Sequence, residues 1–119
     1  MNKFFYLSTC DTCKKIIKTL QLPVHIELID IKFRSILENE LDIMKDLSGS
    51  YESLFSKKAI KFRSLGFNNQ ELSEHDYKRL ILEEYTFLKR PALVVNKQIV
   101  IGNSKESIIK MNHLIKQFY

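Results

Sequence analysis

The chain has 119 residues, of which 45% are hydrophobic and 11% aromatic. This is enough for one domain with a core that depends on neither disulfides nor metal ions. The composition excludes general disorder, and no apolar run approaches the roughly 18–20 residues that a membrane span requires. The net charge of +5 fits a lysine-rich surface or an acidic or oxyanion partner. Direct nucleic-acid binding is not expected, because zinc-finger spacing, an RNA-binding aromatic box and a long basic block are all missing.

The first seven residues contain a cation and an apolar patch. The patch is too short for a secretory signal, and no A-x-A-like cleavage site follows it. We therefore expect a cytoplasmic protein without membrane contact. In that compartment two close cysteines are more often catalytic, redox-sensing or metal-binding than structural.

The first third of the chain predicts strand, helix and strand. Residues 3–7 form an apolar run typical of a buried strand, and apolar residues at helical spacing predict a helix over residues 11–20. Alternation over residues 24–31 predicts a second strand with Val24, Ile26 and Leu28 on one side, a pattern that Asp30 could continue. A connection of this length makes the two strands parallel.

The middle of the chain predicts helices. A capping box at residues 35–38 opens a helix, and residues 51–55 form a short one. Residues 57–69 are basic and are expected to be irregular. Ser73 is expected to cap a further helix, which carries Tyr77, Leu80, Ile81 and Tyr85.

The last third predicts a hairpin and a helix. Residues 92–95 and 98–101 are expected to pair across a two-residue turn, and Ser104 caps the last helix. The order predicts an α/β fold with a four-stranded mixed sheet and with the first and last helices on its faces. We expect one domain over residues 1–119, with a helical insertion at approximately 35–85. The cysteines would follow the carboxyl end of the first strand, where α/β folds place their sites.

Cys10 and Cys13 are the only cysteines. Cys10 directly precedes the predicted helix, so free amides and the helix dipole favour its thiolate and make it the expected nucleophile. Lys14 adds positive charge nearby, while Asp11 opposes it. Cys13 either resolves an oxidised Cys10 or is a small core residue. A zinc site needs four ligands, and the three histidines are far apart in sequence, so no metal is expected.

Three other polar residues have two interpretations each. Thr9 and Thr12 could donate hydroxyl hydrogen bonds to a thiolate, or they could cap the helix. His25 is expected to be a packed or edge histidine within the second strand rather than a base.

These motifs resemble the arsenate reductase/Spx family of thioredoxin-like proteins. The resemblance rests on Cys10-x-x-Cys13, on residues 52–58 and 62–66, and on residues 88–95, where Lys-Arg-Pro leads into an apolar strand. It covers nearly the whole chain. It implies a thioredoxin-like sheet with a helical insertion, and a cis proline at Pro91 beside the reactive thiol.

The resemblance also implies that Arg90 binds an oxyanion or stabilises the thiolate, since its planar donors suit that task. A surface ion pair is the alternative. The other two family arginines are not in place: Lys57 and Lys58 follow the short middle helix, and Gly102 and Asn103 follow the last strand. Arsenate is therefore a possible substrate rather than the expected one.

The activity implied is that of a thiol–disulfide oxidoreductase, in which Cys10 attacks an electrophilic sulfur or oxyanion and Cys13 or glutathione resolves the adduct. The resemblance implies no bound cofactor, glutathione or thioredoxin as the reductant, and a small-molecule or protein thiol or disulfide as the substrate. Three more residues are candidates to hold an anionic partner: Lys14, Lys58 and Thr12.

A regulatory alternative remains open. Spx-like relatives use the Cys-x-x-Cys as an oxidation switch and bind the α subunit of RNA polymerase, and Gly49 stands where they carry a contact glycine. A third alternative is a binding module with a degenerate site.

Overall fold

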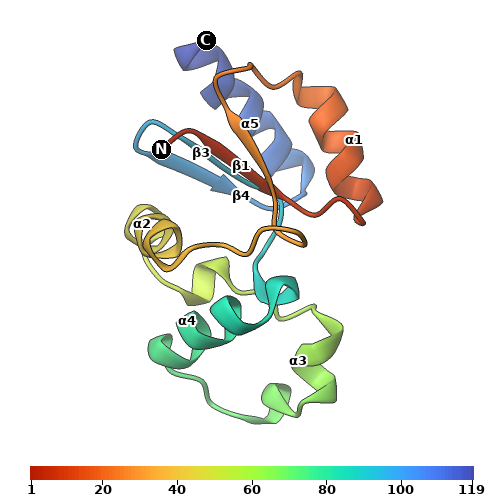
Figure 1. The fold of residues 1–119 in the computed structure, drawn as a ribbon, viewed down its shortest axis with the longest axis vertical. Helices are drawn as coiled ribbons and strands as arrows, with labels where there is room; N and C mark the ends of the chain where they lie inside the picture. The colour runs from red at the N-terminus through yellow and green to blue at the C-terminus, as the bar shows by residue number, and fades with distance from the viewer. The chain divides into compact units, whose positions relative to one another are not determined.

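The computed structural model describes residues 1–119, and the chain divides into two compact units (Figure 1). The first unit combines Met1–Arg34 with Arg90–Tyr119, and the second is Ser35–Lys89. Each unit has its own helices and its own buried apolar residues. None of the helices has the length and apolar character needed to cross a membrane.

The first unit is built around the sheet. Its elements are β1 (Lys3–Tyr6), α1 (Asp11–Leu20), β2 (Glu27–Asp30), β3 (Ala92–Val95), β4 (Gln98–Ile101) and α5 (Lys105–Phe118). The strand order is β2-β1-β3-β4. β1 pairs in parallel with β2, whereas the β1–β3 and β3–β4 pairs are antiparallel. The predicted mixed four-stranded sheet of an α/β fold is therefore confirmed.

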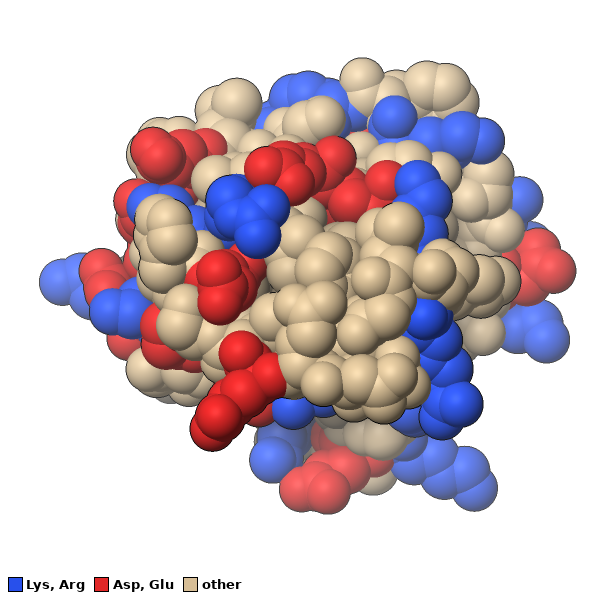
Figure 2. Space-filling view, turned by 90° about the horizontal axis from the view of Figure 1, so that it is seen from below, with Lys and Arg blue, Asp and Glu red and all other residues tan.

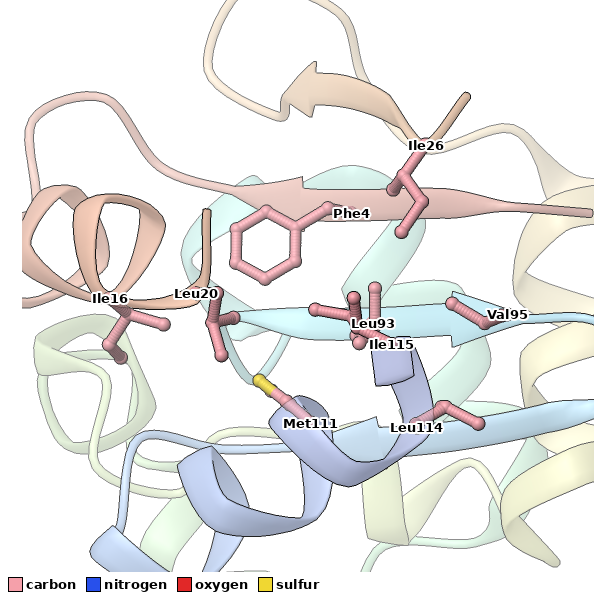
Figure 3. Packing of buried hydrophobic residues seen from close by; sticks show 9 residues of the cluster. All are labelled: Phe4, Ile16, Leu20, Ile26, Leu93, Val95, Met111, Leu114 and Ile115. Atoms are coloured by element: carbon pink, nitrogen blue, oxygen red, sulfur yellow. The ribbon is translucent and has the colours of Figure 1, made fainter. Parts of the chain in front are cut away.

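The core of this unit lies between one face of the sheet and helices α1 and α5 (Figure 3). Its nine buried side chains come from both helices, β1, β3 and the segment before β2: Phe4, Ile16, Leu20, Ile26, Leu93, Val95, Met111, Leu114 and Ile115. The first and last helices thus cover the same face. Each of these buried side chains contributes about 1.5–3 kcal/mol relative to an exposed one, so the packing holds α1 and α5 against the sheet.

The predicted second strand is too long. The Ile26 amide donates to the Pro23 carbonyl oxygen at 3.1 Å, and this turn delays the start of β2 to Glu27. Val24 is left 92% exposed and Leu28 47% exposed, whereas Ile26 is buried. The predicted alternation that grouped Val24, Ile26 and Leu28 on one side is therefore wrong, because the first two residues belong to a turn rather than a strand.

The second unit is helical. Its elements are α2 (Glu38–Ser48), the 3₁₀ turn η1 (Glu52–Leu54), α3 (Ile60–Ser64), η2 (Phe67–Asn69), α4 (Glu74–Glu83) and η3 (Tyr85–Phe87). The short helix expected near residues 51–55 is present as η1. The irregular segment expected at residues 57–69 is wrong, because it contains α3 and η2. Tyr85 begins η3 rather than lying on α4.

The two predicted helix starts in this unit fare differently. The Ser73 hydroxyl accepts from the Asp76 amide at 3.2 Å, and the Asp76 carboxylate accepts from the Ser73 amide at 2.9 Å, as the sequence predicts. The capping box at residues 35–38 is wrong by two positions. α2 has Leu37 as its N-cap, and the Leu37 amide donates to Glu40 at 2.9 Å.

An aromatic cluster centred on Phe55 holds the second unit together. The Phe55 ring lies 5.7 Å from that of Phe62, and 4.9 Å from those of Tyr77 and Phe87, measured between centroids. Phe55 also forms a backbone bridge with Leu88. Phe62 is the only buried residue of α3, whereas Ile60 and Leu65 beside it are exposed. A helix of five residues with one buried side chain shows no apolar periodicity, which explains why the sequence pattern missed it.

Candidate functional site

The end of β1 leads into a tight turn that places Cys10 at the start of α1. The Cys10 amide donates to the Leu7 carbonyl oxygen at 3.0 Å, and the Cys10 carbonyl accepts from the Lys14 amide at 3.2 Å. Cys10 is itself the N-cap, with extended backbone angles and no side-chain cap hydrogen bond. The prediction of a threonine cap at Thr9 or Thr12 is therefore wrong. The first amides of α1 have no helical partner and point toward the Cys10 side.

Cys10 is biased toward its thiolate. Partial burial raises its pKa, but the hydrogen bonds from the Cys13 amide and thiol and from the Thr12 amide, with the charge of Arg90, outweigh this and lower the pKa below its ordinary value. The side chain is only partly buried. Cys10 thus combines a lowered pKa with access to solvent, which is the environment of a reactive cysteine.

Cys13 is in the opposite state. It is fully buried on the first turn of α1. Burial raises its pKa to about 11, and the neighbouring Cys10 sulfur adds to the rise. Both cysteines are free thiols in this structure. At neutral pH Cys13 therefore keeps its proton and supplies it as a hydrogen bond to Cys10.

Arg90 reaches the cysteines through the strand pairing. Its charge lowers the pKa of both thiols. β3 runs antiparallel to β1 with Phe5 opposite Ala92, so the beginning of β3 lies at the end of β1. The Arg90–Pro91 peptide bond is cis, as the family resemblance implies. The sheet thereby brings together residues that are eighty positions apart in sequence.

The candidate anion-binding residues are distributed over both units. Thr12 and Lys14 are exposed on the first turns of α1, and the Thr12 amide donates a hydrogen bond to the Cys10 sulfur. Lys58 is exposed and belongs to the second unit, so its role stays a prediction. Its neighbour Lys57 is held by Glu52 at 2.6 Å.

The sequence interpretation missed the role of Asp30 at the carboxyl end of β2. One oxygen of its carboxylate accepts from the Ser8 amide and from the Lys32 amide, each at 3.2 Å. The signal was present as an acidic residue at the end of the second parallel strand, next to the end of the first. Periodicity assigns such a residue to one face of the strand and does not predict which backbone amides its carboxylate contacts.

His25 lies in the turn before β2 and not in the strand, which corrects the sequence prediction. Its ring is stacked on that of Tyr119, with centroids 6.0 Å apart. The structure contains no group of three or more histidine, cysteine, aspartate or glutamate side chains arranged to hold a metal ion.

The surface charges are mixed on the face that Figure 2 shows. Lysine and arginine side chains and aspartate and glutamate side chains both lie around an area of uncharged atoms. No continuous basic surface crosses this face, so it is unlike the basic stripes that follow a phosphate backbone.

The chain is similar to a family model over most of its length and to two regulatory proteins of Bacillus species. The model of the ArsC family matches residues 5–111. The regulatory protein MgsR of Bacillus subtilis (strain 168) is 28% identical over 61 residues, which are 51% of this chain and 48% of that protein. The chain thus spans about half the length of MgsR. The global transcriptional regulator Spx 2 of Bacillus anthracis is 28% identical over 110 residues, which are 87% of this chain and 80% of that protein.

A solved structure shares the architecture over nearly the whole length. The arsenate reductase from Vibrio cholerae superposes with a TM-score of 0.77 and 17% identity, covering 92% of this chain and 96% of that one. At this identity the likeness concerns the fold, which is the thioredoxin-like arrangement that the sequence resemblance implies.

Proposed function

The chain belongs to the ArsC family, and from this membership and the geometry around Cys10 we propose that it is a thiol–disulfide oxidoreductase. The observation that carries the proposal is the contrast between two cysteines on one helical turn. Cys10 is accessible with a lowered pKa, whereas Cys13 is buried with a pKa of about 11. This division supplies an attacking thiolate and a protonated thiol held in reserve.

In the first half of the reaction the Cys10 thiolate attacks one sulfur of a small-molecule or protein disulfide. A bond forms between Cys10 and that sulfur, and the second sulfur leaves as a thiolate that takes a proton from solvent. The Cys13 thiol then loses its proton and attacks Cys10. The Cys10–Cys13 disulfide forms, the second substrate thiol leaves, and two electrons have passed from the protein to the substrate.

In the second half a cellular reductant returns the two electrons. Two glutathione molecules, oxidised to glutathione disulfide, or the dithiol of thioredoxin would restore both cysteines. Glutathione could also attack the mixed disulfide at Cys10 directly, which would bypass Cys13. No bound cofactor is needed for either route.

Arg90 has two roles in this proposal. Its charge favours the attacking thiolate, and its planar donors would orient an anionic group of the substrate. Thr12 and Lys14 lie exposed on the same helix and are the other candidates for that contact in the first unit. Arsenate is not the expected substrate, because the other two family arginines are replaced and Lys57 is occupied by Glu52.

The test is turnover of hydroxyethyl disulfide by glutathione. We expect Cys10→Ser to reduce the rate about 100-fold or more, because the nucleophile is lost. Cys13→Ser is the matched variant on the same helical turn, and it should retain turnover through the glutathione route. A wild-type rate no higher than that of Cys10→Ser would overturn the proposal.

A redox-sensing regulator that binds the RNA polymerase α subunit is the second candidate. The similarity to Spx 2 over 110 residues favours it. Here Cys10 would be oxidised by a peroxide to the sulfenic acid, and Cys13 would displace water to form the disulfide. Gly49 adds no support for this candidate, because the left-handed backbone at the end of α2, with φ 101°, is enough to explain a glycine there.

The regulator is tested by a binding experiment on the immobilised protein, once after peroxide treatment and once in dithiothreitol. The probe is the purified carboxyl-terminal domain of the α subunit of RNA polymerase. The second candidate predicts different binding in the two states, and Cys13→Ser should remove the difference. No binding in either state would exclude this candidate.

A further inference from the structure

The carboxylate of Asp30 accepts a hydrogen bond from Ser8, in the turn that precedes Cys10. The Ser8 amide donates to Asp30 Oδ1 at 3.2 Å. Burial raises the pKa of Asp30, but the hydrogen bonds from the Ser8 hydroxyl and amide and from the Lys32 amide together outweigh it, so the pKa lies below its ordinary value. The contact joins residues from different strands, 22 positions apart.

The backbone prepares Asp30 for this contact. Tyr6 and Asp30 are the last paired residues of the parallel β1 and β2 strands. The Ile31 amide donates to the Tyr6 carbonyl oxygen at 2.9 Å, which continues the pairing one residue further. The amides of Phe33 and Arg34 donate to the Asp30 carbonyl oxygen at 3.1 and 3.0 Å. The Asp30 backbone is thus fixed, and its side chain is directed at the end of β1.

The turn beyond β1 has few other restraints of its own. Only two residues, Ser8 and Thr9, lie between the Leu7 carbonyl and the Cys10 amide that close it at 3.0 Å. Thr9 is exposed. Cys10 has no side-chain cap hydrogen bond to hold the start of α1. The Leu7 amide bonds the Cys13 sulfur, and the Asp30 carboxylate adds a restraint on Ser8 from the neighbouring strand.

We propose that Asp30 is a positioning residue for Cys10: by holding Ser8 it fixes the turn that directs the Cys10 sulfur at the first amides of α1. The inference rests on the proposed function, in which Cys10 is the nucleophile. Hydrogen bonds from those amides weaken steeply when the donor and acceptor are misaligned. Without the hydrogen bond to Asp30 the turn is less well fixed, the Cys10 sulfur is less well aligned with these amides, and its thiolate is stabilised less.

The test compares the pH dependence of Cys10 alkylation by iodoacetamide, located by mass spectrometry, in Asp30→Ala, Asp30→Asn and the wild type. In Asp30→Ala we expect the midpoint to rise by about half a pH unit, which is about threefold less thiolate at neutral pH. Asp30→Asn keeps an acceptor oxygen for the Ser8 amide, so its midpoint should stay near that of the wild type. Glu27→Gln is the matched control, since Glu27 is an exposed acid on the same strand.

The alternatives give different results. If Asp30 acted through its charge, removing that charge would lower the midpoint in both Asp30 variants, and the inference would be wrong. If Asp30 only stabilised the fold, Asp30→Ala would melt earlier with an unchanged midpoint, which also overturns the inference. Should Asp30→Ala fail to fold, Ser8→Ala removes one of the two Ser8 donors and should raise the midpoint by a smaller amount; an unchanged midpoint there contradicts the proposal.

The same experiment separates this inference from the proposed function. A wild-type midpoint at the ordinary cysteine value would defeat the proposed function itself. A lowered wild-type midpoint that Asp30→Ala leaves unchanged would defeat only the role of Asp30.

Discussion

The two units of this chain both contain groups with shifted pKa values, but the physical causes differ. In the first unit, burial and hydrogen bonds at a helix start divide two identical thiols into one with a lowered and one with a raised pKa. In the second unit the shifts arise mainly in exposed ion pairs, such as Lys57 with Glu52 and Lys61 with Glu84. The first kind of shift creates a reactive group, whereas the second only strengthens the charge that each group already has at neutral pH.

The largest cluster of the second kind surrounds Tyr51. Its hydroxyl donates to Asp42 at 2.5 Å, and Lys78 lies 3.0 Å from the same carboxylate. The ammonium groups of Lys45 and Lys78 lie 5.8 and 5.7 Å from the centroid of the Tyr51 ring. Asp42 raises the pKa of Tyr51, which keeps the phenol protonated. The two thiols with opposite pKa shifts thus lie in the first unit, and the clustered ion pairs lie in the second.

The largest expected effect on stability lies in the second unit. Phe55→Ala removes the ring at the centre of the aromatic cluster and should cost about 3–5 kcal/mol in the free energy of unfolding. Denaturant titration measures this. Phe33→Ala, at a site 79% exposed, is the control and should change little. In folded Phe55→Ala the Cys10 midpoint should stay at the wild-type value; a shift would show that the second unit sets the thiol's reactivity.

The next effect concerns Cys13 and alkaline pH. The unfolded thiol ionises near pH 8.5, whereas the folded one ionises near pH 11. The fold therefore favours the protonated form, and the free energy of unfolding falls as pH rises between these values. The stability contributed by this group, about 3 kcal/mol, should be present at pH 7 and largely lost by pH 11.

Cys13→Ser removes that titration. The stability difference between the wild type and Cys13→Ser should shrink by about 3 kcal/mol from pH 8 to pH 11 when denaturation is followed at both pH values. A difference that stays constant with pH would mean that the Cys13 pKa is not raised by the fold.

Removing one helix cap from each unit should give a smaller loss in the free energy of unfolding. Ser73→Ala in the second unit and Ser104→Ala in the first each remove a hydroxyl that accepts from a helix amide, at 3.2 and 3.0 Å respectively. Each should cost about 1 kcal/mol, read from the denaturant midpoint. Neither should move the alkylation midpoint of Cys10. A change in Ser73→Ala alone would break the assignment of reactivity to the first unit.

The smallest effect is the direct contribution of Arg90. Arg90→Met removes a charge that lowers the pKa of Cys10, so the alkylation rate at pH 7 should fall about threefold, equivalent to half a pKa unit. Arg79→Met, a half-exposed arginine on α4, is the control and should leave the rate unchanged. Equal rates in all three proteins would remove Arg90 from the account.

Much of the sheet unit could be predicted because its signals are local. The apolar runs give β1 and β3, and Ser104 caps α5 as expected. The errors fall where a local pattern was overruled by a contact. The turn after Pro23 shortened β2, and Phe62 ordered α3 within a basic segment through its contact with Phe55.

The sequence predicted which residues belong to the candidate site but not how they are buried or which residues they contact. The spacing of Cys10 and Cys13 and the family resemblance indicated both cysteines and Arg90. The opposite states of the two thiols depend on burial, which spacing does not report. The contact from Asp30 to Ser8 depends on the register of two parallel strands, which no local pattern contains.

The measurement that tests this account most directly is the pH titration of alkylation at Cys10 and Cys13 in the wild-type protein, with each site resolved by mass spectrometry. We expect Cys10 to react with a midpoint below the ordinary cysteine value of about 8.5, while Cys13 stays unmodified until well above it. Equal midpoints for the two cysteines, or a Cys10 midpoint at or above the ordinary value, would contradict it.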